Sequence, residues 1–266
     1  MKAKWKNMPA MIRVLVYFML MQLATVIAGA VPSVNELWFF FGVSFALTAL
    51  FLKAEGRSLR SLGAYPLNGK YLRQLAAGAA AGMTLLVATA IITIRLTGAQ
   101  WQVNTGTSVI SLLLPLVGCL WSAYVQEFVF RGYPFQLLLT HYRHWIAQLA
   151  VAVPFGLMHV NSAMPLDVAL LVMLTTGVGS VLFGLAYLAT GNLMLPVGLH
   201  VGWNYAQWLL PRTPGEGGGI IVITHAHITA SFFQIIVPYL VVLFFAIVYL
   251  HRRVGRQAAG RTHKLV

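Results

Sequence analysis

The sequence predicts an all-α fold, a polytopic membrane protein of about eight transmembrane helices. Composition is the first indication, because 59% of the 266 residues are hydrophobic and only 9% are charged. Soluble domains carry roughly 25% charged and 45–50% apolar residues. A mean hydropathy of +0.79 is the second indication, and the third is a series of apolar runs long enough to cross a bilayer. Since lipid offers no hydrogen-bond partner to an open strand, each run is expected to be a helix.

Eight apolar runs are the predicted transmembrane helices. A spanning helix needs about 20 residues; the second and seventh runs are short, and the fourth continues weakly to residue 143. The first run follows Lys2, Lys4 and Lys6 but is longer than the apolar core of a signal peptide, so we expect an uncleaved first helix. The runs fall at about 11–30, 37–52, 74–97, 107–130, 145–164, 166–189, 192–210 and 231–250.

The basic residues predict the membrane topology. The chain has 18 Lys and Arg against five Asp and Glu, which gives a formal net charge of +13. These cations gather at the ends of the apolar runs and not on one polar face, a pattern typical of topology signals and not of a nucleic-acid partner. With a cytoplasmic amino terminus and eight spans, only Arg95 and Arg212 of the 18 fall outside. We therefore expect an even number of spans and two cytoplasmic termini.

Polar side chains within the predicted spans are the candidate functional residues, because an ionisable group at the centre of a span costs at least about 2.5–3.5 kcal/mol. Glu127 is the one carboxylate inside an apolar run and away from its ends. His159 and His200 lie in two later spans, and Asn204 shares a helical face with His200. One carboxylate, two histidines and one amide are the groups needed to activate a water and to stabilise an oxyanion.

Each of these residues also has a purely structural interpretation. Glu127 and Arg131 have the i,i+4 spacing of a helix ion pair, which could simply dock one helix against another. His159 alone fits an interior histidine bonded to a neighbouring carbonyl, and Asn204 alone fits a helix-packing amide. The combination on three separate spans favours chemistry.

The outer loop at 211–230 holds a further pair of histidines. In the segment THAHIT, a strand-like alternation would turn His225 and His227 to one side. Two ligands do not complete a zinc site, so this pair alone does not predict a metal.

Three motifs, in chain order, resemble the CPBP family, the bacterial relatives of the Rce1-type CAAX prenyl endopeptidases, also called the Abi group. The family pattern is Glu-Glu-x-x-x-Arg on one span, Phe-x-x-x-His on the next and His-x-x-x-Asn on a later one. Each motif is weak alone, whereas the ordered set is specific. The corresponding segments here are QEFVFR (126–131), FGLMH (155–159) and HVGWN (200–204).

The resemblance implies eight helices with a polar intramembrane cavity formed by spans four to seven and open toward the cytoplasm. It implies an intramembrane endopeptidase in which a glutamate and His159 activate the attacking water, and His200 and Asn204 hold the oxyanion. In this chain Glu127 would be that glutamate, with Gln126 positioning the water. Arg131 would orient Glu127. A divalent metal such as zinc is a further expectation, with Glu127, His159 and His200 as its candidate ligands.

The apolar runs, the basic residues and the resemblance together predict the setting of the protein. We expect a single transmembrane domain over 1–266, with the family core at about 107–210 and a basic cytoplasmic tail at 251–266. The expected location is the bacterial inner membrane. The expected partners are the lipid bilayer and a peptide or protein substrate that enters from the membrane or the cytoplasmic side.

Gln126 departs from the family pattern, in which a first glutamate usually activates the water. A neutral amide cannot take a proton at physiological pH, although its oxygen can orient a water. Glu127 could act as the base with His159 after a modest rotation of the helix, since adjacent residues point about 100° apart. Alternatively His159 acts alone, or the chain binds a peptide without cutting it.

Three functions therefore remain open. The first is an intramembrane endopeptidase, and the second is a non-catalytic membrane binding or bacteriocin-immunity protein on the same fold, which Gln126 favours. The third is a small proton-coupled transporter in which Glu127 and the histidines form a relay.

The depth of the candidate residues sets a geometric condition. If the fourth span ended at Arg131, Glu127 would lie about 6 Å from its end, and His159 would lie much deeper in the next span. The two meet only if the helix continues past Gly132 or if the fifth span starts later. The apolar YPFQLLL segment favours continuation, despite Pro134.

Overall fold

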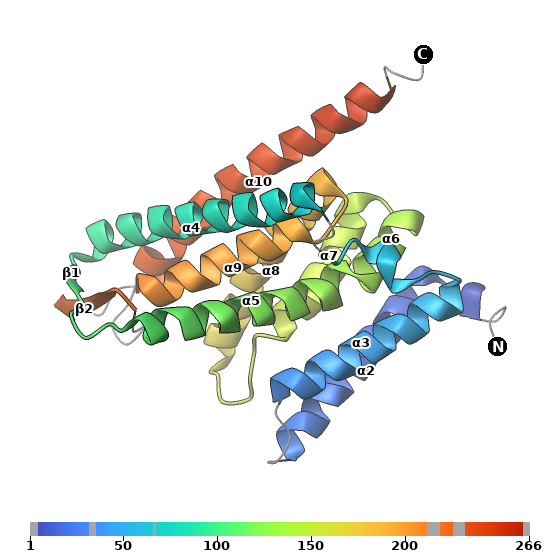
Figure 1. The fold of residues 1–266 in the computed structure, drawn as a ribbon, viewed down its shortest axis with the longest axis horizontal. Helices are drawn as coiled ribbons and strands as arrows, with labels where there is room; N and C mark the ends of the chain where they lie inside the picture. The colour runs from blue at the N-terminus through green and yellow to red at the C-terminus, as the bar shows by residue number, and fades with distance from the viewer. Residues whose placement is uncertain (1–4, 32–35, 66–67, 212–218, 226–231, 263–266) are drawn as a thin grey trace. The chain divides into compact units, whose positions relative to one another are not determined.

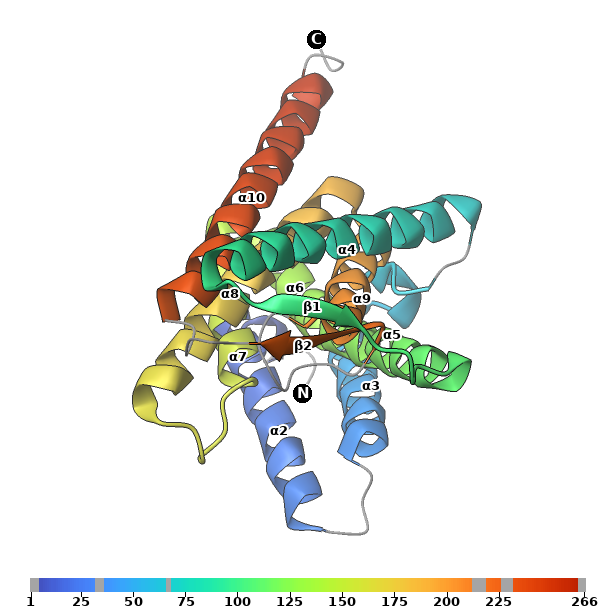
Figure 2. The same cartoon turned by 90° about the vertical axis from the view of Figure 1, so that its left-hand side faces the viewer.

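The computed structural model describes residues 5–31, 36–65, 68–211, 219–225 and 232–262. In this part of the chain, α-helices follow one another and are joined by mostly short loops, with one pair of short strands (Figure 1, Figure 2). The strands are β1 (Gln100–Val103) and β2 (Ile221–His225). The helices are α2 (Ala10–Ala30), α3 (Glu36–Glu55), the 3-10 helix η1 (Leu59–Leu62), α4 (Gly69–Thr97), α5 (Val109–Arg131), α6 (Tyr133–His141), α7 (His144–Leu157), α8 (Leu166–Thr190), α9 (Met194–Leu209) and α10 (Phe232–Thr262).

The prediction of an α-helical, polytopic membrane protein is confirmed. Within the described residues, six helical stretches are long and apolar enough to cross a bilayer: α2, α3, α4, α5 together with α6, α8 and α10. Two of the eight predicted spans are shorter helices, α7 with 14 residues and α9 with 16. At 1.5 Å per residue these two measure about 21 and 24 Å, less than the hydrocarbon thickness of about 30 Å.

The fifth predicted span, 145–164, is wrong at its carboxyl end, because α7 stops at Leu157. A turn around Asn161 replaces the helix: Asn161 Oδ1 accepts from the Ala163 amide at 3.0 Å, and the Asn161 carbonyl accepts from Met164 at 3.2 Å. Short polar side chains of this kind compete with the helix for backbone groups. His159 therefore lies just past a helix end and not inside a helix.

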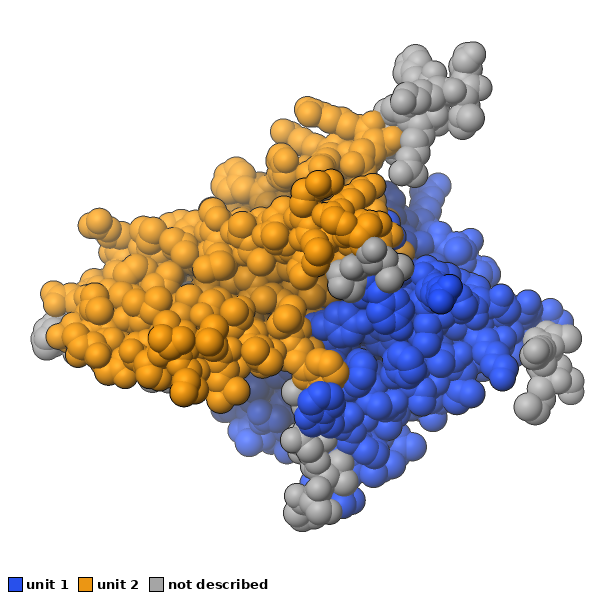
Figure 3. Space-filling model, in the orientation of Figure 1, with its two compact units in different colours: residues 1–65, 124–184, 191–193 blue, residues 66–123, 185–190, 194–266 orange. Residues whose placement is uncertain are grey.

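The chain divides into two compact units, which are described separately (Figure 3). Both α5 and α8 contribute to each unit. Unit 1 contains residues 1–65, 124–184 and 191–193, and unit 2 contains residues 66–123, 185–190 and 194–266.

Unit 1 is built on the α2–α3 hairpin and on α6, which contacts both of these helices as well as α7. Buried polar pairs tie the hairpin together. Tyr17 Oη on α2 and Thr48 Oγ1 on α3 lie 2.9 Å apart. Nearer the helix ends, Arg13 donates to the Glu55 carboxylate. Such bonds hold helices together in lipid, where burial of apolar side chains contributes little to association.

A sharp break separates α5 from α6 at Gly132. The backbone there has φ −71° and ψ −116°, outside the helical region, and a Cβ at this position would collide with the Phe128 carbonyl. Pro134 sits in the first turn of α6, where its missing N–H has no helical partner to lose. The expected continuation past Gly132 is thus present as a second helix, which runs to His141.

Unit 2 is built on α4 and α9, which lie side by side in both views (Figure 1, Figure 2). Helix α10 packs on α4, where Gln234 Nε2 donates to the Leu96 carbonyl at 2.7 Å. The antiparallel strands β1 and β2 join the loops after α4 and α9, with Val103 opposite Ile221. A strand is present near His225, as β2, whereas His227 lies outside the described residues.

Candidate active site

Glu127 and Arg131 form the ion pair that their spacing predicts. Arg131 Nη1 lies 3.4 Å from Glu127 Oε1 on the last turn of α5. Both side chains are buried, with exposed fractions of 0% for Glu127 and 1% for Arg131. A charge buried in this way is tolerated only when it is paired and hydrogen-bonded. The pair lies in the interior of unit 1, away from solvent.

Arg131 is anchored more strongly by α8 than by the carboxylate. Its Nη2 donates at 2.6 Å both to the carbonyl and to the Oγ of Ser180. The guanidinium also lies 4.8 Å from the ring centroid of Phe155 and 5.4 Å from that of Phe183, in cation–π geometry. Because these contacts fix the guanidinium, they also fix the cation that Glu127 faces.

His159 is connected to Arg131 through Phe155, which contacts both side chains. Its Nδ1 lies 2.7 Å from the Phe155 carbonyl, and the two rings have centroids 4.8 Å apart. A carbonyl oxygen only accepts, so Nδ1 is the donor, and in the neutral imidazole the lone pair is then on Nε2. The side chain is half-buried. His159 is therefore held in the tautomer that can take a proton at Nε2.

Gln126 presents a different face of α5 from Glu127. Adjacent helical residues are rotated by about 100°; Glu127 is fully buried, and Gln126 is half-buried. The amide therefore does not occupy the place of the carboxylate within unit 1.

Gln136, which sequence reasoning missed, holds the segment that follows the motif. Its Nε2 donates to the Leu62 carbonyl at 3.0 Å, with a longer contact of 3.4 Å to the Arg131 carbonyl. Its Oε1 accepts from Arg57 Nη2 at 2.9 Å. Gln136 thus connects the end of α5, the start of α6 and the η1 loop. Nothing in the sequence pattern marks it, since an isolated glutamine in YPFQLLL carries no period or motif.

Glu55 lies beyond the predicted run 37–52, but it is the last residue of α3 and the centre of a second polar cluster. Besides Arg13, it accepts from Trp5 Nε1 at 3.1 Å and from Tyr133 Oη at 3.2 Å. The Glu55 side chain is 10% exposed. Because Tyr133 follows directly on Gly132, this carboxylate connects the α2–α3 hairpin to the break after the motif.

The other two candidate residues, His200 and Asn204, lie on α9 in unit 2. Two glycines of α9, four residues apart, let this helix contact the backbone of α4 closely. A Cβ at Gly198 would collide with the Leu75 carbonyl, and one at Gly202 would collide with the Ala79 carbonyl. Such small-xxx-small spacings let helix backbones approach closely. His200, between the two glycines, is 4% exposed.

Asn204 lines a hollow of about 450 Å³ in unit 2, between α5 and α9. The opposite wall comes from the middle of α5, and it includes Ser122 and Cys119. Polar groups on both walls make this hollow suitable for a ligand with hydrogen-bonding groups, the kind of pocket in which a few placed polar atoms orient a molecule. The remaining lining residues are Pro115, Gly118, Gln207 and Trp208.

The candidate residues thus form two groups. Within unit 1, Glu127 contacts Arg131, which lies over Phe155, and Phe155 in turn contacts His159. Gln126 belongs to the same unit. Within unit 2, His200 and Asn204 share α9, one turn apart.

A metal-binding group of three His, Cys, Asp or Glu side chains is not found among the described residues. Glu127, one of the expected ligands, already faces a guanidinium cation at 3.4 Å, and a cation in that place competes with a divalent metal for the same carboxylate. The residues do not fit a metal as they stand. The metal stays a prediction of the resemblance.

One family matches the chain. Residues 107–206 match the family described as type II CAAX prenyl endopeptidase Rce1-like. This stretch contains all three motifs, and the match confirms the resemblance drawn from them. No curated protein matches the chain.

Proposed function

We propose that the chain is an intramembrane endopeptidase, on the basis of the match of residues 107–206 to the type II CAAX prenyl endopeptidase Rce1-like family. Its reaction is hydrolysis of a peptide bond in a peptide or protein substrate that reaches the site from the membrane or the cytoplasm. The hydrogen bond between His159 Nδ1 and the Phe155 carbonyl supports this proposal most directly.

His159 is the proposed general base. Its Nδ1 donates to the Phe155 carbonyl, so in the neutral imidazole the lone pair is on Nε2, the atom that we propose takes a proton from water. The water oxygen then attacks the carbonyl carbon of the scissile bond. The proton held at Nε2 passes to the leaving nitrogen as the carbon–nitrogen bond breaks, so that acid and amine are the products.

Glu127 is the proposed partner of His159 in activating the water, and Arg131 positions Glu127. The cluster of Ser180, Phe155 and Phe183 around the guanidinium supports this role, because it holds Arg131 in place before substrate binds. Preorganised charges stabilise a transition state without a cost of reorganisation.

His200 and Asn204 are the proposed donors to the oxyanion. A ring N–H and a side-chain amide N–H are suitable donors for such an oxygen. The hollow lined by Asn204 supports the proposal, because it gives that amide access to a ligand. The glycine contacts of α9 with α4 hold the helix that carries both residues.

Gln126 supports a second candidate function. Since an amide cannot act as the base, the chain could be a silent relative that binds a peptide or a bacteriocin without cutting it. The two functions predict opposite effects of restoring the acid at this position.

The setting of the proposed enzyme is the bacterial inner membrane with both termini cytoplasmic. Support comes from the charge distribution, in which sixteen of 18 Lys and Arg fall on one side of an eight-span arrangement. Labelling of single cysteines near each terminus with a membrane-impermeant reagent tests this orientation.

The test is peptide cleavage by the full-length protein in nanodiscs. Wild type, Glu127→Gln, His159→Ala and Gln126→Glu are compared with quenched fluorescent peptides, prenylated and unprenylated, with and without a chelator. His141→Ala is the control for His159, because His141 is an exposed histidine of the same unit. We expect kcat/KM to fall about 100-fold or more in the Glu127 and His159 variants, the typical contribution of general acid–base catalysis.

The outcomes separate the functions. Cleavage by wild type that is lost in both variants and kept in the control supports the endopeptidase. A silent wild type that gains cleavage in Gln126→Glu supports the binding protein. Cleavage that His159→Ala leaves unchanged contradicts the proposed base.

A further inference from the structure

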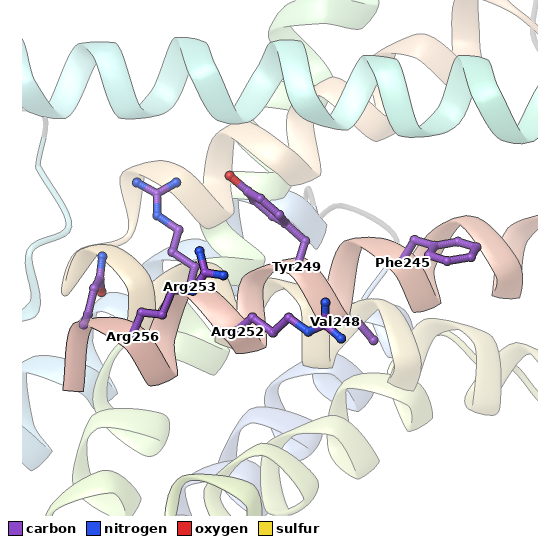
Figure 4. A pocket seen from close by; sticks show the side chains of 7 residues that line it. Phe245, Val248, Tyr249, Arg252, Arg253 and Arg256 are labelled. Atoms are coloured by element: carbon purple, nitrogen blue, oxygen red, sulfur yellow. The ribbon is translucent and has the colours of Figure 1, made fainter. Parts of the chain in front are cut away.

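The last turns of α10 carry a cationic surface that the proposed hydrolysis does not use. Arg252, Arg253 and Arg256 are exposed, and among the described residues none of them is paired with a carboxylate. The helix itself contains no acidic residue. Figure 4 shows the three arginines in succession along the helix, after Phe245 and Tyr249.

A hollow of about 620 Å³ on the surface of α10 is lined by side chains of this helix alone, among them the three arginines. Its apolar end is aromatic: Phe245 and Tyr249 are 67% and 64% exposed. Its polar end is lined by the three arginines and by Gln257. The hollow thus changes along the helix axis from an apolar to a strongly cationic lining (Figure 4).

The position of this change matches the surface of a bilayer. The apolar part of α10, residues 233–250, measures about 27 Å at 1.5 Å per residue, close to the hydrocarbon thickness of about 30 Å. Tyr249 then falls at the interface, where exposed tyrosines are favoured. Arg252 and Arg253 follow within one turn, at the depth of the lipid headgroups.

The helix does not end where its apolar part ends. It continues to Thr262, and in both ribbon views its carboxyl-terminal end projects away from α4 (Figure 1, Figure 2). Five Lys and Arg lie within residues 252–264. Clusters of four to eight such residues beside a transmembrane helix are typical of anionic-lipid binding.

We propose that the hollow around Arg252, Arg253 and Arg256 is a binding site for an anionic phospholipid, with the phosphate on the guanidinium groups and the acyl chains along Phe245 and Tyr249. Arginine suits this ligand because its planar group can donate two parallel hydrogen bonds to one phosphate. The inference does not depend on the protease activity.

The test is lipid binding by the full-length protein in dodecyl maltoside, measured by native mass spectrometry. Dioleoylphosphatidylglycerol and dioleoylphosphatidylcholine are titrated in parallel, because they share acyl chains and a phosphate and differ in net charge. Inorganic phosphate is added as a competitor in a third series. For the wild type we expect affinity for phosphatidylglycerol to exceed that for phosphatidylcholine at least about 10-fold.

The variant Arg252→Gln/Arg253→Gln/Arg256→Gln should lose most of this preference. The matched control is Arg60→Gln/Lys70→Gln/Arg73→Gln, which removes the same number of exposed cations from another place. The control should keep the preference. A second variant, Arg252→Lys/Arg253→Lys/Arg256→Lys, retains the charge and should show an intermediate preference. It keeps the test valid if the glutamine variant folds poorly.

Three results would overturn the proposal. Equal affinity of the wild type for both lipids would show that the protein does not prefer the anionic lipid. Equal losses in the α10 and control variants show a diffuse surface charge and no site. Full displacement of the lipid by millimolar inorganic phosphate shows an anion site that does not recognise a lipid.

Discussion

The two units hold their helices together in different ways. Unit 1 uses buried polar side chains: Arg131 on Ser180, Gln136 on the Leu62 carbonyl and Arg13 on Glu55. In unit 2 the central contact is made by glycines, which bring the backbones of α4 and α9 together. In lipid the burial of apolar side chains contributes little to helix association. Both units therefore stabilise their helix contacts by other interactions.

The difference matters for the candidate chemistry. Polar anchors of unit 1 act directly on Glu127 and, through Phe155, on His159, so they define the orientation of single side chains. Glycine contacts of unit 2 act on the position of the whole helix that carries His200 and Asn204. A substitution in unit 1 should therefore disturb one group, whereas one in unit 2 should move a helix.

Loss of the Arg131 guanidinium should have the largest effect on stability. Arg131→Met leaves Glu127 as a buried charge without its cation and breaks the Ser180 bonds, so we expect a loss of about 3–5 kcal/mol in the free energy of unfolding. Thermal unfolding in detergent measures it. The exposed Arg143→Met is the control, and the double variant Arg131→Met/Glu127→Leu should recover part of the loss. An unchanged unfolding temperature in Arg131→Met would show that the pair does not stabilise unit 1.

A methyl group at Gly202 should have the next largest effect. In Gly202→Ala the new Cβ meets the Ala79 backbone, which cannot rotate away, so we expect a loss of about 1–3 kcal/mol from overpacking. Gly42→Ala is the matched control, because a Cβ there meets nothing within 4 Å. Alanine is the better helix former, so the control should be neutral or gain up to about 1 kcal/mol. Equal unfolding temperatures for the two variants would contradict the close α4–α9 contact.

Removal of the charge at Glu55 should have the smallest of these effects on stability. Glu55→Gln weakens the bonds from Arg13, Trp5 and Tyr133, but the site is partly open to solvent, so we expect a loss of about 1–2 kcal/mol. Asp167→Asn is the control, because Asp167 is an exposed carboxylate. The readout is thermal unfolding together with limited proteolysis of the amino-terminal segment. If the variant unfolds like the control, the cluster does not hold the α2–α3 hairpin.

Several features of the fold were readable in the sequence. Apolar runs and the charge distribution predicted a helical membrane protein, and most of the expected runs lie within observed helices. The end of α7 was not predicted, because the apolar residues around His159 hide the turn in which Asn161 Oδ1 accepts from the Ala163 amide. The glycine spacings at 78/82 and 198/202 were available as a signal and were not used.

The candidate residues were predicted by motif, and their neighbours were not. Glu127 and Arg131 pair as their spacing indicates, but Ser180 lies 49 positions away and carries no pattern. Glu55 lies outside the predicted run 37–52, so the sequence did not mark it as a candidate. Only the packing of α2, α3 and α6 shows that it accepts hydrogen bonds from three distant side chains.

The sequence by itself determined the membrane class, the helical periodicity and the identities of Gln126, Glu127, His159, His200 and Asn204. These properties depend only on composition and on the spacing of nearby residues, both of which can be read from the sequence. The tertiary structure decided which partners fix them: Ser180 and the Phe155 carbonyl in unit 1, and the α4 backbone against α9 in unit 2. Such partners are set by three-dimensional packing between distant segments, for which local periodicity contains no information.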